Sequence, residues 1–198
     1  MATGTNEGNL VYKSRKLVKL LTEGEVDSLL AVAARDPFHD AVIKTFYMCG
    51  LRVSELVSLP SQILKANSDM IFITGKGGRE RMVPFPPVVR DCLMNCKPGA
   101  QYIFPKGNGH ISRQAILNII KELAQSAGIR QTVTPHQLRH SFATHMLEGG
   151  ADLVSLMLLL GHSDISTTEK YLHVRTKHLI ETIKKHPLAR ENNGTNTL

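Results

Sequence analysis

Strong signals for the start and the end of a helix frame the residues that follow Thr134. Thr134 supplies an N-cap hydroxyl, Pro135 stands at the first helical position and Gln137 at the third, which is the capping-box pattern. The pair Gly149 and Gly150 then provides a flexible backbone on which a helix commonly ends. These residues predict a helix with a well-fixed start, and they restrict this part of the chain to a helical fold.

Two further short helices are predicted downstream. Asp152 can open the first of them, Leu153 to Leu160, and Gly161 can end it in the left-handed conformation. A serine and an aspartate beyond that glycine can cap the second, which runs to Tyr171. Apolar residues at helical spacing in the first helix are expected to form core: Leu153, Leu156, Met157 and Leu160.

Polar side chains lie at the breaks between these helices. His136 and Arg139 are three residues apart in the opening turns of the first helix, where free backbone N–H groups and the helix dipole favour an anion. His162 is presented at a turn, and Tyr171 follows it in the last helix. Each residue alone is more often a solvated surface residue than a functional one, so the functional interpretation depends on their joint occurrence.

Three segments together resemble the tyrosine site-specific recombinases, the phage integrase family. The C-terminal signature is carried by His136-Gln137-Leu138-Arg139-His140, Leu160-Gly161-His162, Thr167-Thr168 and Tyr171. The first arginine motif is matched by Gly50-Leu51-Arg52-Val53-Ser54-Glu55-Leu56, and the hairpin that carries the family's lysine by Gly75-Lys76-Gly77-Gly78-Arg79-Glu80-Arg81. The match runs from about Leu21 to Ala189 and is nearest to the Xer-like chromosome dimer resolvases.

The resemblance implies DNA strand cleavage and rejoining through a 3′-phosphotyrosyl intermediate, without metal, ATP or another cofactor. All six expected catalytic positions are filled, by Arg52, Lys76, His136, Arg139, His162 and Tyr171. A tyrosine with a pKa near 10 is ionised in only about one molecule in a thousand at neutral pH, so its attack needs help from a base. The sequence carries no carboxylate cluster for magnesium and no His-Glu-x-x-His pattern for zinc.

The side chains fit distinct roles in that reaction. His136 is expected to act as the general base, directly or through water, while Arg52 and Arg139 clamp the non-bridging oxygens of the scissile phosphate. His162 would add a hydrogen bond to the same oxygens. Lys76, at the tip of a glycine-flanked hairpin, would protonate the leaving 5′-hydroxyl.

DNA-binding residues are expected on two elements. The hairpin places Arg79 and Arg81 beside the lysine, and an amphipathic helix over residues 112–127 carries further polar side chains, Arg113, Gln114 and Lys121. Composition agrees, because 24 Lys and Arg residues against 17 Asp and Glu residues give a formal net charge of +7. We therefore expect double-stranded DNA as the partner.

The remaining chain completes a fold that is mainly α with a small antiparallel β-sheet (α+β). Helices are predicted from Thr22 to about Ala34, over 37–49, 53–59 and 88–96, a sheet within 62–84, and a short strand over 102–104. Residues 1–20 are interpreted as a basic tail or linker, 21–189 as the catalytic domain and 190–198 as a disordered tail. Most members of the resembled family carry a further N-terminal helical domain, so DNA binding by these residues alone is expected to be weaker.

The C-terminal and cellular expectations follow the same resemblance. A helix over 175–185 with one apolar face is expected to dock on a neighbouring subunit, which implies self-association or a partner recombinase on DNA. Neither a long apolar run nor a signal-peptide pattern is seen, so a cytoplasmic, nucleoid-associated protein without membrane contact is expected. Three cysteines without zinc spacing, Cys49, Cys92 and Cys96, are interpreted as reduced thiols that are mostly buried.

Three other functions are compatible with parts of the sequence. A type IB topoisomerase-like nicking-closing enzyme would use the same chemistry on one duplex. A non-cutting DNA-binding accessory protein would keep the fold alone, although six filled positions argue against it. A metal-dependent hydrolase could use the histidines, and its activity would be sensitive to a chelator.

Overall fold

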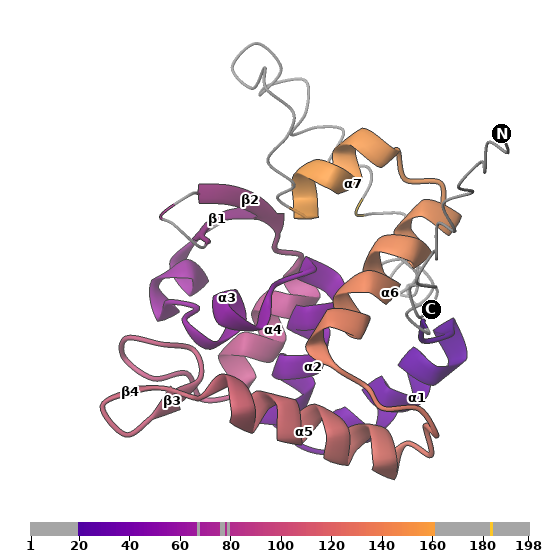
Figure 1. Cartoon of the computed structure of the whole chain (residues 1–198). Helices are drawn as coiled ribbons and strands as arrows, with labels where there is room; N and C mark the ends of the chain where they lie inside the picture. The colour runs from indigo at the N-terminus through magenta and orange to yellow at the C-terminus, as the bar shows by residue number, and fades with distance from the viewer. Residues whose placement is uncertain (1–19, 67, 76–77, 79, 161–182, 184–198) are drawn as a thin grey trace, which may run out of the picture.

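The computed structural model of the chain describes residues 20–66, 68–75, 78, 80–160 and 183 (Figure 1). The helices in these ranges are α1 Glu23–Ala33, α2 Pro37–Cys49, α3 Val53–Val57, α4 Pro87–Asn95, α5 Arg113–Ser126, α6 Pro135–Glu148 and α7 Leu153–Leu160, with a 3-10 helix η1 at Ser61–Lys65. The strands are β1 Met70–Thr74, β2 Glu80–Pro84, β3 Pro105–Lys106 and β4 Gly109–His110. The predicted fold class, mainly α with a small antiparallel sheet, is confirmed.

Side-chain caps fix where several helices begin. The Thr22 hydroxyl accepts from the Glu25 amide at 3.1 Å while the Glu25 carboxylate accepts from the Thr22 amide at 2.9 Å, a complete capping box at the start of α1. In the same way the Thr134 hydroxyl accepts from the amide of Gln137 at 3.2 Å, at the start of α6. The Ser112 hydroxyl caps α5. These hydrogen bonds confirm the predicted starts of the helices. The starts could be predicted because each depends on residues within one turn.

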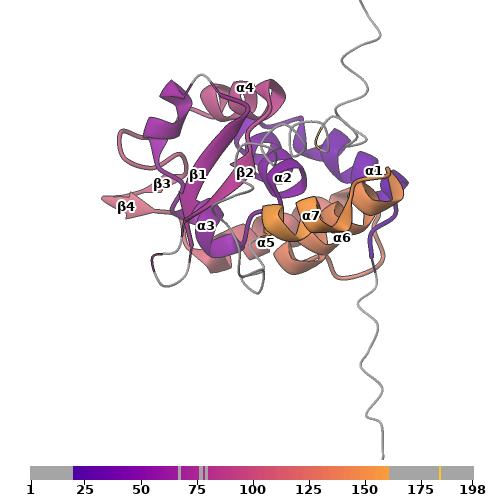
Figure 2. The same cartoon turned by 90° about the horizontal axis from the view of Figure 1, so that it is seen from above.

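Helix α2 lies at the centre of the bundle, against α1, α4 and α6 (Figures 1 and 2). Its last nine residues are buried almost without interruption, and Phe46 is fully inaccessible to solvent. Phe142 of α6 is also fully buried, as is Phe104 in the segment that precedes β3. Each such side chain contributes about 1.5–3 kcal/mol by leaving water, so this core holds the ends of α2 and α6 in place.

The hairpin of β1 and β2 lies beside the helical bundle (Figure 2), as the sequence predicted. Ile71 pairs with Val83 and Ile73 pairs with Arg81 across the two strands. Because side chains alternate between the faces of a strand, Arg81 shares the inward face with the fully buried Val83. Phe72, on the opposite face, is 62% exposed.

Three expectations about the helices and strands were wrong. The start of the expected sheet, near residue 62, is the 3-10 helix η1, and residues 102–104 form only an isolated bridge between Tyr102 and Pro60. Leu153 was expected in the core but is 58% exposed. The buried face of α7 consists of Ser155, Leu156, Leu159 and Leu160, and Leu153 lies off that face at the first helical position.

The three cysteines are buried and free, as predicted. Burial raises the pKa of the Cys96 thiol to about 11, and burial together with Asp40 raises the pKa of Cys92 to about 12. Both thiols are therefore protonated at neutral pH. No helix within the described ranges is long and apolar enough to cross a membrane.

Candidate active site

A tight turn between α2 and α3 brings Arg52 to the surface. Helix α2 ends at Gly50, whose φ of +57° is the left-handed conformation that glycine adopts most readily. A Cβ at Gly50 would lie 2.8 Å from the ring of Phe142, so the turn is also packed directly on α6. Arg52 follows as the N-cap of α3, and its side chain is 42% exposed.

Arg139 reaches the same turn from α6. Its side chain is only 12% exposed. The guanidinium donates hydrogen bonds to the backbone carbonyl oxygens of Gly50 and of Leu160, the last residue of α7. Arg52 also points a guanidinium N–H at the Leu160 carbonyl, at 3.4 Å. Two arginines that are far apart in the sequence are thus brought together at one backbone acceptor.

The carboxylate of Glu55 lies at the centre of this cluster, with its side chain 2% exposed. One oxygen accepts from Nη1 of Arg52 at 2.9 Å, and the other accepts from the Arg52 backbone N–H at 2.7 Å. Arg81 donates to both oxygens, from Nη2 at 2.8 Å and from Nε at 3.3 Å. Nη1 of Arg139 lies 4.0 Å from the carboxylate. We refer to Arg52, Glu55, Arg81 and Arg139 as the arginine cluster.

The arginine cluster carries excess positive charge in a partly buried place. Burial would raise the pKa of Glu55, but hydrogen bonds and charge from Arg81, and then from Arg52, lower it below the usual value of 4.5, so the carboxylate is ionised. Burial, and then the charges of Arg81 and Arg52, lower the pKa of Arg139 to about 10, which leaves it protonated at neutral pH. Three cations against one carboxylate leave two positive charges, an arrangement that favours a bound anion.

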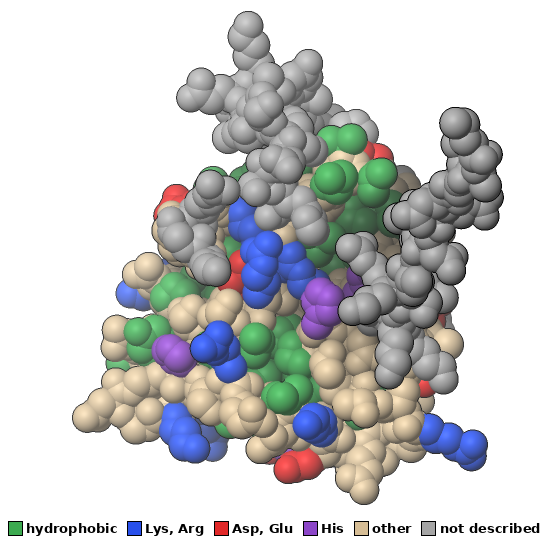
Figure 3. Space-filling view, in the orientation of Figure 1, with side chains coloured by type: hydrophobic (Ala, Val, Ile, Leu, Met, Phe, Trp, Pro, Cys, Tyr) green, Lys and Arg blue, Asp and Glu red, His purple; other side chains and the backbone are tan. Residues whose placement is uncertain are grey.

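His136 lies in the first turn of α6, and its ring stacks on that of His140 with centroids 6.4 Å apart. It is exposed and shares a helix face with Arg139 through their three-residue spacing. Figure 3 shows histidine side chains over α6 beside a group of Lys and Arg side chains. A solvent-accessible imidazole next to a positively charged site that binds an anion can exchange protons with a bound substrate.

The described residues therefore include three of the six predicted catalytic side chains. Arg52 and Arg139 share an acceptor, and His136 lies on the helix of Arg139. Lys76, His162 and Tyr171, and the predicted DNA-binding residue Arg79, lie outside the described residues. Within those residues no group of three or more His, Cys, Asp or Glu side chains is placed to hold a metal ion.

The other predicted DNA-binding residues occupy two different environments. Arg113, Gln114 and Lys121 are exposed on α5, and the Gln114 amide donates to Asn118 at 2.9 Å. Arg81 instead has a side chain that is only 10% exposed and lies in the arginine cluster. Its position follows from the alternation along β2, which puts it on the face of Val83.

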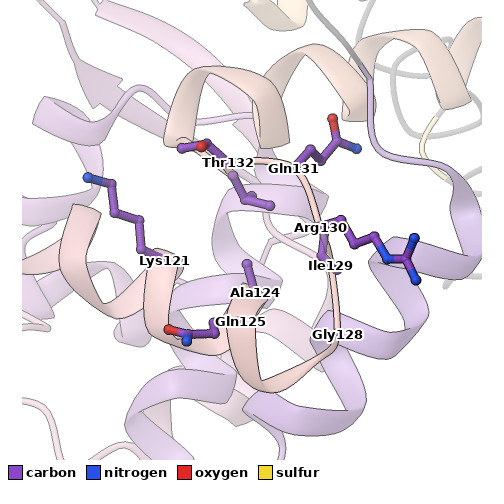
Figure 4. A pocket seen from close by; sticks show the side chains of 9 residues that line it. Lys121, Ala124, Gln125, Gly128, Ile129, Arg130, Gln131 and Thr132 are labelled. Atoms are coloured by element: carbon purple, nitrogen blue, oxygen red, sulfur yellow. The ribbon is translucent and has the colours of Figure 1, made fainter.

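A shallow groove of about 490 Å³ lies between α5 and the loop that precedes α6 (Figure 4). The basic side chains of Lys121 and Arg130 stand on its two walls, and both residues are exposed. On the α6 side, Gln131 turns away to donate to the Glu25 carboxylate at 3.1 Å. The groove extends the exposed polar surface of α5 toward the start of α6.

Glu55 is the residue that the sequence interpretation missed. Its signal is local, because a glutamate three residues after the N-cap commonly accepts from the N-cap amide. That position explains its bond to the Arg52 backbone, but not its contact with Arg81, 26 residues away. The convergence of three arginines on one carboxylate required the tertiary structure.

Comparison with known proteins shows which family the chain resembles. A model of the phage integrase family matches residues 19–178. The chain is 41% identical over 189 residues to the tyrosine recombinase XerC of Erythrobacter litoralis (strain HTCC2594), covering 88% of this chain and 62% of that protein. It is 39% identical over 202 residues to the tyrosine recombinase XerD of Rhizobium meliloti (strain 1021), covering 90% of this chain and 65% of that protein.

The fold has solved relatives as well. The crystal structure of XerA recombinase matches with a TM-score of 0.68 and 27% sequence identity, over 87% of this chain and 66% of that one. This chain spans less than two thirds of the length of each of these three relatives.

Proposed function

Because the chain belongs to the phage integrase family, we propose that it is a site-specific DNA recombinase or integrase that cleaves and rejoins DNA strands. The observation that carries the proposal is the arginine cluster. Arg52 and Arg139 aim their guanidinium groups at one backbone carbonyl oxygen, beside a carboxylate that cannot neutralise all of the charge. A scissile phosphate, with its charged non-bridging oxygens, is the anion that this arrangement fits.

In the proposed reaction, the hydroxyl oxygen of Tyr171 attacks the scissile phosphorus. His136 accepts the tyrosine proton, directly or through water, and the bond from phosphorus to the 5′-oxygen breaks as the 3′-phosphotyrosyl bond forms. Lys76 gives a proton to the departing 5′-oxygen, so a free 5′-hydroxyl leaves. The number of phosphodiester bonds is conserved, so a 5′-hydroxyl of another strand can reverse the step without ATP.

The two arginines would act mainly on the transition state. As the phosphorus becomes five-coordinate, negative charge grows on its non-bridging oxygens, and Arg52 and Arg139 can each donate two parallel hydrogen bonds to them. His162 would add a further bond to the same oxygens. Glu55 would hold Arg52 in place, because its carboxylate accepts hydrogen bonds from both the side chain and the backbone N–H of Arg52. Fixed donors of this kind need no reorganisation when the charge develops.

The substrate is proposed to be double-stranded DNA. The net charge of +7 and the exposed Arg113, Gln114 and Lys121 of α5 support groove or phosphate contact by that helix. Residues 21–189 would form the catalytic domain, and the helix expected over 175–185 would dock on a neighbouring subunit on DNA. Such a DNA-acting protein would work in the cytoplasm, on the nucleoid.

The test is covalent capture on a nicked DNA substrate that loses the cleaved 5′-hydroxyl fragment, so that rejoining is blocked. The reaction is run in EDTA over a panel of candidate sites, and denaturing gels separate the protein–DNA adduct from free DNA. We expect an adduct with the unmodified protein and none with Tyr171→Phe. Tyr102→Phe is the matched control and should form the adduct, because Tyr102 lies in the segment before β3 and outside the arginine cluster.

The same assay separates the other functions. Adducts that relax a supercoiled circle without ever joining two duplexes would indicate a nicking-closing enzyme. DNA binding without any adduct, also in the presence of an intact partner recombinase, would indicate an accessory protein and would overturn the proposal. Cleavage that appears only in a parallel reaction without EDTA would indicate a metal-dependent hydrolase.

A further inference from the structure

Arg81 directs all three of its guanidinium nitrogens into the protein. Nε donates to Glu55 at 3.3 Å, Nη2 donates to Glu55 at 2.8 Å and lies 3.5 Å from the Gly50 carbonyl oxygen, and Nη1 donates to the Leu159 carbonyl oxygen. The side chain is 10% exposed, and each of the three guanidinium nitrogens points at an acceptor within the fold. The side chain is committed to acceptors within the fold.

Those acceptors are the ones that hold the two phosphate-binding arginines. Glu55 binds the side chain and the backbone of Arg52. The Gly50 carbonyl also accepts from Arg139, and Leu159 immediately precedes Leu160, whose carbonyl faces both arginines. Arg81 therefore contacts the α2–α3 turn, the buried carboxylate and the end of α7 at once, from β2.

We propose that Arg81 is a positioning residue for the phosphate clamp, one that sets the alignment of Arg52 and Arg139 without contacting the DNA itself. This inference rests on the proposed function. Arg81 orients the Glu55 carboxylate so that its other lone pairs face Arg52, and it fixes the backbone carbonyls against which Arg139 is aligned. Its charge also keeps Glu55 ionised, since Arg81 contributes the largest effect that lowers the Glu55 pKa.

The chemistry of the contacts requires an arginine at this position. A planar guanidinium presents donors in three directions within one plane, which serves one carboxylate and two carbonyls together. The ammonium of lysine is a compact point charge on a flexible stem, so it can keep the charge but not this set of directions. Arg81→Lys therefore separates the effect of charge from that of geometry, and Arg81→Gln removes both.

The test compares two nicked substrates at saturating DNA, one with an ordinary scissile phosphate and one with an uncharged methylphosphonate there. The ordinary phosphate depends fully on the clamp, whereas the methylphosphonate lacks one charged oxygen, so less negative charge develops there for the clamp to stabilise. We expect Arg81→Gln to slow adduct formation on the phosphate on the order of 100-fold and on the methylphosphonate by less than about 10-fold. Arg81→Lys should show the same selectivity with a smaller loss, and Kd for DNA should change by less than about threefold.

Two controls accompany these variants. Arg90→Gln removes a comparable half-buried arginine on α4, one that donates to the Ser68 carbonyl at 2.6 Å and stacks over Phe85, and it should leave both rates unchanged. The double variant Glu55→Gln with Arg81→Gln should be no slower than the slower single variant, because both changes disrupt one unit. All rates are compared below the melting temperature of each variant.

Three outcomes would overturn the inference. Equal slowing on both substrates would mean a general structural role, and a weaker Kd with an unchanged rate would mean that Arg81 contacts DNA. Additive losses in the double variant would mean that Arg81 does not act through Glu55. If the unmodified protein forms no adduct on either substrate, the proposed function fails and this inference fails with it, an outcome that is distinct from the other three.

Discussion

The guanidinium of Arg139 donates a hydrogen bond to the backbone carbonyl oxygen of Gly50, which lies 89 residues earlier in the chain. The bond joins the start of α6 to the end of α2, and it places Arg139 beside the turn that carries Arg52. Because the acceptor belongs to the backbone, its position depends on the conformation of Gly50 and not on the identity of a side chain. Stability and catalysis should therefore be coupled at this turn.

Gly50→Ala should destabilise the fold by at least about 2 kcal/mol. The left-handed conformation costs a non-glycine residue roughly 1 kcal/mol, and the new methyl group would also overlap the Phe142 ring, 2.8 Å away. Gly128→Ala is the matched control, because Gly128 has a φ of +72° but no atom within 4 Å of the place that a Cβ would occupy. Urea unfolding should show a smaller loss for Gly128→Ala, and equal losses would mean that the contact with Phe142 is unimportant.

Arg139→Lys should slow adduct formation by about 100-fold or more, which is on the order of 3 kcal/mol of transition-state stabilisation. Lysine keeps the charge but cannot donate to the two carbonyls of Gly50 and Leu160 and still present a fork to the phosphate. Single-turnover rates at saturating DNA measure the effect. Arg130→Lys, an exposed arginine in the loop before α6, should retain the rate, and a full rate for Arg139→Lys would show that charge alone suffices.

Acid should destabilise the protein in part through Glu55. Its pKa is lower in the folded protein than the usual value of 4.5, so the stabilisation from its ionised form is fully present above that value. It is lost as the pH falls below 4.5 and through the lower folded pKa. The free energy of unfolding, measured against pH, should fall less steeply in this range for Glu55→Gln, although that variant is less stable at neutral pH. An unchanged slope would contradict the prediction.

Tyr47→Phe should lower the free energy of unfolding by about 1–3 kcal/mol. The Tyr47 hydroxyl and Nδ1 of His145 are 2.8 Å apart, and both residues are buried between α2 and α6. Loss of the hydroxyl removes that partner from a ring nitrogen of His145, a residue that is only 4% exposed. Tyr102→Phe, at a half-buried tyrosine, should cost much less, and equal melting temperatures for the two variants would count against the prediction.

Replacing Arg113 and Lys121 of α5 together with alanine should weaken DNA binding more than catalysis. If each contacts a phosphate, the slope of log Kd against log salt should fall by about one per contact, with little change in the cleavage rate at saturating DNA. Arg35→Ala, at an exposed arginine between α1 and α2, serves as the control for the loss of one positive charge away from α5. Salt slopes that match those of the control would exclude α5 from the DNA interface.

Local sequence predicted most of the helices because their starts depend on side chains within one turn. Thr22 with Glu25 and Thr134 with Gln137 form caps that need no distant partner. The hairpin of β1 and β2 was also predicted, since its two strands lie on either side of a glycine-rich segment of the sequence. The weaker signal for a strand over residues 102–104 gave a wrong prediction, because these residues make only one isolated bridge.

The same limit applies to burial. The apolar spacing of α7 predicted Leu153 in the core, yet Leu153 is exposed, and Ser155 lies on the buried face instead. Spacing gives the period of a helix, whereas the packing of its neighbours decides which side of the helix turns inward. Only the placement of α7 against α6 and β2 settled that choice.

The sequence by itself determined the family, the fold class and the identity of the candidate catalytic side chains, because motifs and helix caps consist of residues that are close together in the sequence. Only the tertiary structure decided that Arg52, Arg81 and Arg139 converge on Glu55, and that Arg81 faces inward. These contacts join α3, β2 and α6, and they satisfy a buried carboxylate whose partners are up to 84 residues away along the chain. An unpaired charge is costly when it is buried. The buried carboxylate therefore needs cationic partners, and the fold can supply them from residues at any distance in the sequence.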